Sequence, residues 1–61
     1  MHPLQALLAG HVLGTLMQVG PSVGFTPEPQ VDEHGNYLPI IDVTHVDGTV
    51  LTITIEVLDA R

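Results

Sequence analysis

The four histidines, His2, His11, His34 and His45, are the side chains of this chain best suited to metal binding or proton transfer. A metal site needs several ligands within a few ångströms of one point. His34 and His45 fall near opposite ends of one predicted strand, about 30 Å apart at ~3.3 Å per residue, so they do not share a site. His11 lies among Leu and Val in a predicted helix. We interpret it as a neutral interface residue whose protonation below about pH 6 weakens an oligomer.

Carboxylates gather at one end of the predicted sheet. Asp32, Glu33 and His34 belong to one loop, and Asp59 returns to the same end. Oxygen ligands there suit Ca²⁺ or Mg²⁺, but their spacing matches no cation-binding loop. We interpret them as solvated turn residues, and a cation site at this end is the alternative.

Nucleophilic chemistry has little support in this sequence. There is no Cys, Ser22 is the only Ser and Tyr37 is the only Tyr. The chain has no glycine-rich phosphate loop, and one helix on three strands leaves little room for an enclosed pocket. We therefore predict a protein that is not an enzyme, with no catalytic residue, no metal site and no cofactor.

The charge balance narrows the range of partners. The formal net charge is −6, and Arg61 is the only Lys or Arg. Phosphate contacts need several basic residues, so we expect no nucleic-acid partner. The uncharged run 4–19 is shorter than the about 20 residues of a membrane span and lacks a basic leader, so we expect no membrane partner and a cytoplasmic location.

A helix is expected over residues 3–19. Pro3 suits a first helical position, and Gly20 followed by Pro21 is typical of a helix stop. His11, Thr15 and Gln18 fall on one narrow stripe and the remaining circumference is apolar, which predicts burial on more than one side. Ala6, Gly10 and Gly14 recur every four residues. This spacing fits close packing of the helix on a sheet within one chain, or a helix–helix contact between protomers.

Three strands are expected, at about 23–32, 36–45 and 49–58. Residues 49–58 alternate between apolar and polar side chains. Of two possible turns before this strand, a three-residue loop with Gly48 in the left-handed conformation pairs Val43 with Leu51, apolar against apolar. The same loop type, with Gly35 left-handed, pairs Val31 with Tyr37.

The first hairpin, continued at that register, pairs Pro29 with Pro39 and Phe25 with Val43. Pro39 then lies in the central strand, where a missing N–H is unfavourable, so we expect a bulge or break near it. The other face of the sheet would carry apolar residues among threonines, which is unusual for a solvent face. Those residues are Leu38, Ile40, Val50 and Leu58.

These elements predict a single α+β domain over 1–61, one N-terminal helix on a three-stranded antiparallel meander. A domain this small buries only about 60% of its surface, so we expect a homo-oligomer, with a dimer as first choice. Prolines protect the first strand, whereas the third is an open edge. We predict a two-fold dimer through this edge, with the helices side by side. Its interface residues are Ala6, Gly10, His11, Gly14, Val50, Thr52, Thr54 and Glu56.

The absence of Lys and Cys, the single Asn and the short length resemble the small uncharacterised proteins of actinobacterial phages, in composition and length only. The resemblance implies a viral protein in the host cytoplasm or the virion. We expect a non-enzymatic structural or interaction protein that binds another protein, as a virion component or an inhibitor of a host factor. The alternative is a small-ligand or nucleotide-binding module with a site between protomers.

Overall fold

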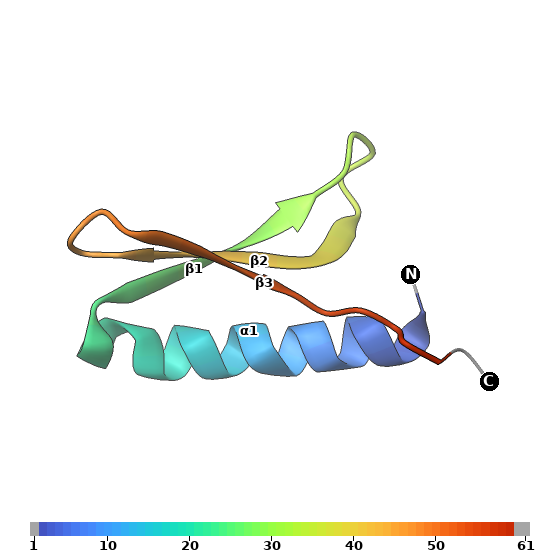
Figure 1. Cartoon of the computed structure of the whole chain (residues 1–61), viewed down its shortest axis with the longest axis horizontal. Helices are drawn as coiled ribbons and strands as arrows, with labels where there is room; N and C mark the ends of the chain where they lie inside the picture. The colour runs from blue at the N-terminus through green and yellow to red at the C-terminus, as the bar shows by residue number, and fades with distance from the viewer. Residues whose placement is uncertain (1, 60–61) are drawn as a thin grey trace.

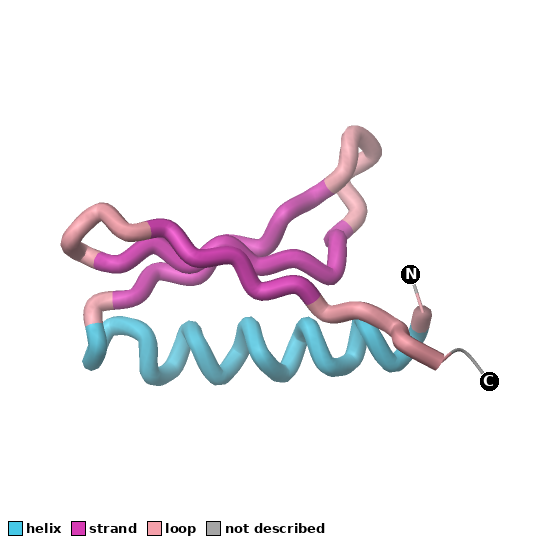
Figure 2. Tube along the Cα trace, viewed as in Figure 1, coloured by secondary structure: helices cyan, strands magenta, loops and turns pink. Residues whose placement is uncertain are grey.

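The computed structural model describes residues 2–59. Along the chain lie α1 (Pro3–Val23), β1 (Phe25–Val31), β2 (Tyr37–His45) and β3 (Val50–Thr54). The strands form one antiparallel sheet in the order β1-β2-β3, and α1 runs across one face of it (Figure 1). Figure 2 shows the resulting two layers, one helix beneath one sheet. The predicted α-β-β-β architecture is confirmed.

The start of α1 is fixed by a reciprocal capping box. The Leu4 N–H donates to His2 Nδ1 at 3.1 Å, and the His2 N–H donates to Gln5 Oε1 at 3.0 Å. Pro3 follows the cap, where its missing N–H costs no helical hydrogen bond. The helix therefore begins where the sequence predicts.

The end of α1 differs from the prediction, because the helix passes through Gly20 and Pro21 and ends at Val23. The clash that normally ends a helix before proline involves the Cβ of the preceding residue, and glycine has none. Gly20 is also buried, and a Cβ there would lie 2.6 Å from the Phe25 carbonyl oxygen. The helix stop is Gly24, which is left-handed with φ 79°.

Both hairpin loops have the predicted geometry. Gly35 and Gly48 have φ of 82° and 95°. The Asp32 N–H donates to the Asn36 carbonyl at 2.9 Å, which leaves a loop of three residues between them. The His45 N–H donates to the Thr49 carbonyl at 2.8 Å and closes the second loop in the same way.

The strand registers are partly as predicted. Val43 pairs with Leu51 in the second hairpin, and Val31 pairs with Tyr37 in the first. Beyond that pair the predicted register is wrong, because Pro29 pairs with Ile41 rather than with Pro39. The two-residue shift lies opposite Pro39, where a bulge was expected. A shift of two residues keeps the side chains from Phe25 to Pro29 on their predicted face, so the apolar face survives the change in that part of the strand.

The Phe25 partner changes for the same reason: it pairs with His45, not with Val43.

The strands are shorter than predicted, and β3 most of all, since it ends at Thr54 instead of continuing to 58. The Ile55 N–H still donates to the Pro39 carbonyl at 2.9 Å, but Pro39 has no N–H to return the bond. The Gln5 Nε2 amide donates to the Ile55 carbonyl instead, at 2.9 Å. The chain beyond β3 therefore leaves the sheet and runs beside the first turns of α1 (Figure 1).

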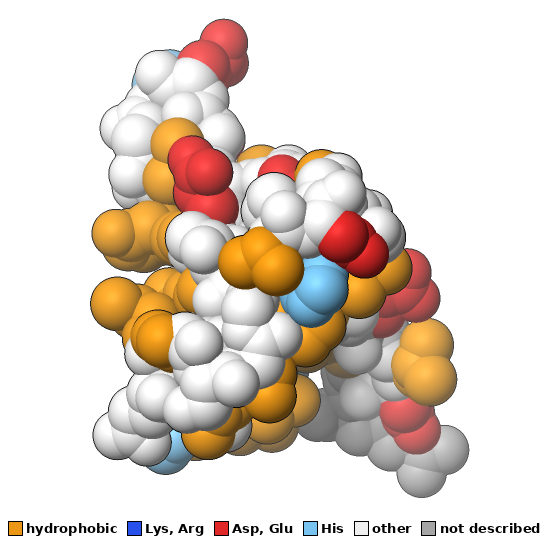
Figure 3. Space-filling model, turned by 90° about the vertical axis from the view of Figure 1, so that its left-hand side faces the viewer, with side chains coloured by type: hydrophobic (Ala, Val, Ile, Leu, Met, Phe, Trp, Pro, Cys, Tyr) orange, Lys and Arg blue, Asp and Glu red, His pale blue; other side chains and the backbone are white. Residues whose placement is uncertain are grey.

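The core is small and lies between α1 and the centre of β2. Ile41 and Val43, 1% and 3% exposed, are the buried large hydrophobic residues of the part that the structure describes. α1 packs closely against β1 and β2, and its backbone lies farther from β3. Figure 3 shows hydrophobic side chains reaching the surface of the molecule. The large hydrophobic residues that remain exposed are Leu4, Leu7, Leu8, Met17, Val19, Val23, Val31, Tyr37, Val46, Val50, Leu51, Val57 and Leu58.

Candidate interaction surfaces

The outer edge of β3 is open to another strand. The bonds that join His45 to Thr49 and Pro39 to Ile55 show that the odd-numbered residues of this strand turn their backbone groups toward β2. The backbone N–H and C=O groups of Val50, Thr52 and Thr54 therefore point outward. No proline, lysine or glycine lies between 50 and 54 to block a second strand.

The edge of β1 is closed to strand addition. The Val46 N–H donates to the Gly24 carbonyl at 3.0 Å. The backbone N–H and C=O groups of the even-numbered residues of β1 therefore point toward β2. Pro27 and Pro29 accordingly face outward, where their missing N–H groups would have been ladder donors. The two edges of the sheet thus differ sharply in their capacity to pair.

An apolar groove of about 270 Å³ runs between the first half of α1 and the bulged end of the first hairpin. The hairpin tip rises away from the helix at this end (Figure 1). Helix and strands contribute equally to the lining, which comprises Ala6, Ala9, Gly10, Leu13, Pro29, Tyr37, Leu38 and Ile41. Gly10 and Gly14 have open space where a Cβ would be, so neither is required for packing within one chain.

The opposite flank of α1 carries larger apolar side chains. At about 100° per residue, Leu4, Leu8 and Val19 lie on the far side of the helix from Ala6 and Gly10. Gln5 is bonded to the chain that follows β3, so this flank faces the β3 side of the molecule. Leu51 is half-exposed on the inner face of β3, which the helix does not cover. Apolar side chains of the helix and of β3 are therefore left exposed on the β3 side.

The outer face of the sheet centres on Asp42. Gln30 Nε2 donates to both Asp42 carboxylate oxygens, at 3.1 and 3.0 Å, and Thr52 Oγ1 donates at 3.0 Å. Glu28 pairs directly across from Asp42, a placement of like charges that is unfavourable without such donors. These three hydrogen bonds give Asp42 a structural role in tying the strands together.

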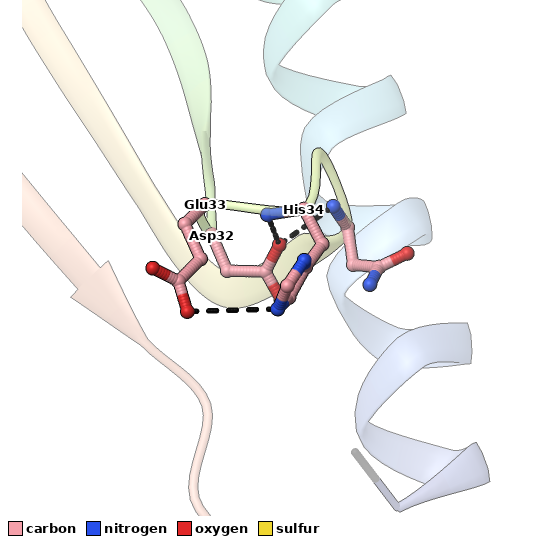
Figure 4. Close-up of polar contacts among 4 residues, drawn as sticks. Asp32, Glu33 and His34 are labelled. Atoms are coloured by element: carbon pink, nitrogen blue, oxygen red, sulfur yellow. Dashed lines mark hydrogen bonds and ion pairs between the residues drawn. The ribbon is translucent and has the colours of Figure 1, made fainter.

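The turn carboxylate Asp32 is occupied by its own loop (Figure 4). Its Oδ1 accepts from the backbone N–H groups of His34 at 2.8 Å and Asn36 at 2.9 Å. The bond from Asn36, followed by that from His34, lowers the pKa of this carboxyl below its usual value. Glu33 Oε1 lies 3.5 Å from His34 Nε2, and both side chains are largely exposed. The loop therefore presents an ionised, solvated acidic tip.

The second turn is built in a similar way around Asp47. Its Oδ1 accepts from the Thr49 N–H at 2.8 Å and lies 3.0 Å from His45 Nδ1. The hydrogen bonds from Thr49 and then from His45 lower the pKa of Asp47. The His45 ring also lies 5.0 Å from the Phe25 ring, which anchors the turn to the start of β1.

The predicted interface residues fall into separate groups. Val50, Thr52 and Thr54 share the open edge of β3, and Glu56 follows it, exposed. Ala6 and Gly10 line the groove on the β1 side. His11 is exposed on the helix, away from the sheet. One two-fold contact at β3 therefore does not bring the small residues of the helix together.

Two contributors to these surfaces were absent from the sequence predictions. The helix pattern gives Gln5 no particular role, but its bond to Ile55 joins segments fifty residues apart. Leu38 was placed on the outer sheet face, but the bulge turns it into the groove. The missing N–H of Pro39 was the one available signal for both.

Within residues 2–59, no three His, Cys, Asp or Glu side chains group closely enough to hold a metal ion. Over the same residues, α1 is the one helix long and apolar enough to cross a membrane. Core helices of soluble proteins and signal sequences have the same length and composition, so this property does not assign a location.

Comparisons with known proteins identify no relative: no family model, no curated protein and no solved structure matches this chain.

Proposed function

We propose that this chain is a non-enzymatic interaction protein that works as a two-fold homodimer joined through the open edge of β3, and that the dimer binds another protein. The observation that carries the proposal is the contrast between the two sheet edges. β1 is closed by Pro27 and Pro29, whereas β3 turns unpaired backbone groups outward along its whole length. A soluble protein rarely leaves such an edge uncovered.

The strength of the contact depends on more than backbone pairing. Three outward residues on each β3 strand give at most six interchain hydrogen bonds. At a net 0.5–1.5 kcal/mol each these contribute about 3–9 kcal/mol, against an association cost of about 4–15 kcal/mol. Burial of roughly 400 Å² of apolar surface adds about 10 kcal/mol. A stable dimer therefore needs the exposed apolar side chains on the β3 side as well as the strand edge.

The geometry of the edge fits this requirement. A two-fold axis perpendicular to the sheet extends it to six antiparallel strands and keeps both helices on the same face. Leu51 and the flank of Leu4, Leu8 and Val19 then face their copies across the axis. The grooves lined by Ala6 and Gly10 lie on the outer flanks, where they stay free for a partner.

The partner is expected to be a protein. The chain carries seven acidic residues and a single basic one, so its field attracts basic surfaces and repels nucleic acid. The compositional resemblance to phage small proteins supports a role as a virion component or as an inhibitor of a host factor. Both roles require a protein partner.

Thr54→Pro tests the dimer. Thr54 N–H points outward, so proline removes a donor of the interchain ladder without removing one of the monomer. Thr54→Val keeps the N–H and serves as the matched control. We expect light scattering at micromolar concentration to give a dimer for the wild type and the valine variant, and the 6.5 kDa monomer for the proline variant. A dimeric proline variant would place the contact elsewhere.

A second candidate function is supported by the groove itself. Its apolar lining suits a small apolar ligand, and the absence of Lys and Arg from residues 2–59 argues against a nucleotide. Its volume of about 270 Å³ is below the 300–1,000 Å³ of typical ligand sites. Native mass spectrometry of the purified protein distinguishes this candidate, because a bound metabolite adds a fixed mass.

A further inference from the structure

The groove beside α1 remains unfilled in one chain, and the β3 contact does not reach it. Its helix wall is built from Ala6, Ala9 and Gly10, which have little or no side chain. Its opposite wall is Tyr37 and Leu38, placed there by the bulge. A surface with small residues on one wall and larger apolar residues on the other admits a second helix at close range.

Acidic residues beside the groove indicate which kind of helix it binds. Pro29 and Tyr37, on the strand wall, lead into the 32–36 loop, whose tip carries Asp32 and Glu33. Glu33 is largely exposed, and its carboxylate is available to a cation from outside. His34 lies beside Glu33, but no permanently charged cation matches these carboxylates among residues 2–59, because the single Lys or Arg of this chain is Arg61.

A second copy of the chain is a poor occupant for this reason. The helix of a second copy, Pro3–Val23, contains no Lys or Arg to meet Asp32 and Glu33. A strand is a poor occupant too, because the edge beside the groove is closed by Pro27 and Pro29. An amphipathic helix with basic residues beside its apolar face satisfies both the groove and the acidic loop.

We infer that the groove between α1 and the first hairpin is the partner-binding site, and that it takes an amphipathic helix of a partner protein whose apolar face is flanked by Lys or Arg. This inference rests on the proposed function, since it specifies the partner. The apolar side chains of that helix enter beside Gly10, and its basic residues face Asp32 and Glu33. In the dimer there are two such sites, one on each outer flank.

The test uses a labelled 18-residue amphipathic helix of Leu, Ala and Lys as a probe, with fluorescence anisotropy as the readout. One control peptide replaces every Lys with Glu, and another keeps the composition but scrambles the apolar face. We expect saturable binding of the probe, and at least tenfold weaker binding of either control. Equal binding of the scrambled peptide would reduce the effect to general charge attraction and overturn the inference.

Gly10→Leu locates the site on the protein. A Cβ at Gly10 meets nothing within 4 Å, so the variant folds and its leucine narrows the groove. Gln18→Leu adds the same side chain to an exposed position about two turns further along α1, outside the groove, and is the matched control. We expect at least a tenfold loss of probe affinity for Gly10→Leu alone. Unchanged affinity, or a loss shared by both variants, would show that the groove is not the site.

Two further outcomes separate this inference from the dimer proposal. Thr54→Pro leaves the groove intact. If this variant binds the probe as a monomer, the groove is supported as the binding site, and this assignment does not depend on the β3 contact. The second outcome concerns the molar mass in solution. If the wild type forms species larger than a dimer, and Gly10→Leu prevents their formation, a second copy of the chain occupies the groove. That result would overturn the inference while leaving the β3 dimer in place.

Discussion

The hydrogen bond from the Gln5 side chain to the Ile55 carbonyl joins α1 to the chain beyond β3. Its removal should lower the free energy of unfolding. The Gln5 amide replaces the N–H that Pro39 lacks, and the Gln5 Oε1 also accepts the His2 N–H of the helix cap. Gln5→Met keeps length and helix propensity but removes both bonds. Each bond contributes about 1 kcal/mol, and burial of the apolar Met side chain offsets part of the loss. We therefore expect the free energy of unfolding to fall by about 1–2 kcal/mol.

Gln5→Glu separates the two roles of this residue. Glutamate still accepts the His2 N–H and is favourable in the first helical turn, but it has no amide to donate to the Ile55 carbonyl. We therefore expect a stability between those of the wild type and the methionine variant. In a chain of this length 1 kcal/mol lowers Tm by about 4–8 °C, which thermal unfolding followed by circular dichroism resolves easily.

Amide hydrogen exchange shows where the stability is lost. The Ile55 amide, bonded to the Pro39 carbonyl, should exchange faster in both variants, because the chain beyond β3 loses its attachment to α1. The comparison is made at one protein concentration, since a dimer is stabilised by mass action. A glutamate variant with wild-type Tm and unchanged Ile55 exchange would refute the anchoring role of Gln5.

Three further predictions concern backbone and turns. Gly20→Ala should lower Tm because its Cβ meets a backbone carbonyl at 2.6 Å, whereas Gly10→Ala, in open space, should raise stability by about 1 kcal/mol through helix propensity. Gly48→Val should cost about 1–3 kcal/mol more than Thr49→Val in chemical denaturation, because φ at Gly48 is 95°. The lowered pKa of Asp32 stabilises the fold above pH about 4, and this stability is lost as pH falls through the folded-state pKa. Asp32→Asn should flatten that acid-side loss in a pH series of urea titrations.

The elements of this fold were predictable because their signals are local. The alternation of residues 50–54 and the glycines at 35 and 48 specify strands and loops without knowledge of the rest of the chain. A three-residue loop fixes the register of the pair next to it, and that is where the predicted registers are correct. The register of the first hairpin fails only past Pro39, where the pairing of β2 with β1 shifts by two residues.

The surfaces were less predictable because they depend on how α1 lies on the sheet. The outward groups of Thr52 and Thr54 follow from hairpin register alone, so the sequence identifies that edge. Which flank of the helix faces β3 depends on the Gln5 bond and on the close approach of Gly20 to β1, both long-range contacts. The groove depends in addition on the bulge that turns Leu38 inward.

Amide hydrogen exchange along β3, at several protein concentrations, tests the central claim most directly. In one chain the amides of Leu51 and Ile53 face β2 and are protected, while those of Thr52 and Thr54 point outward. Pairing of two copies should protect Thr52 and Thr54 as well, increasingly so as concentration rises, and dilution should release them first. Free exchange of these two amides at every concentration, beside a protected Ile53, would contradict the β3 dimer.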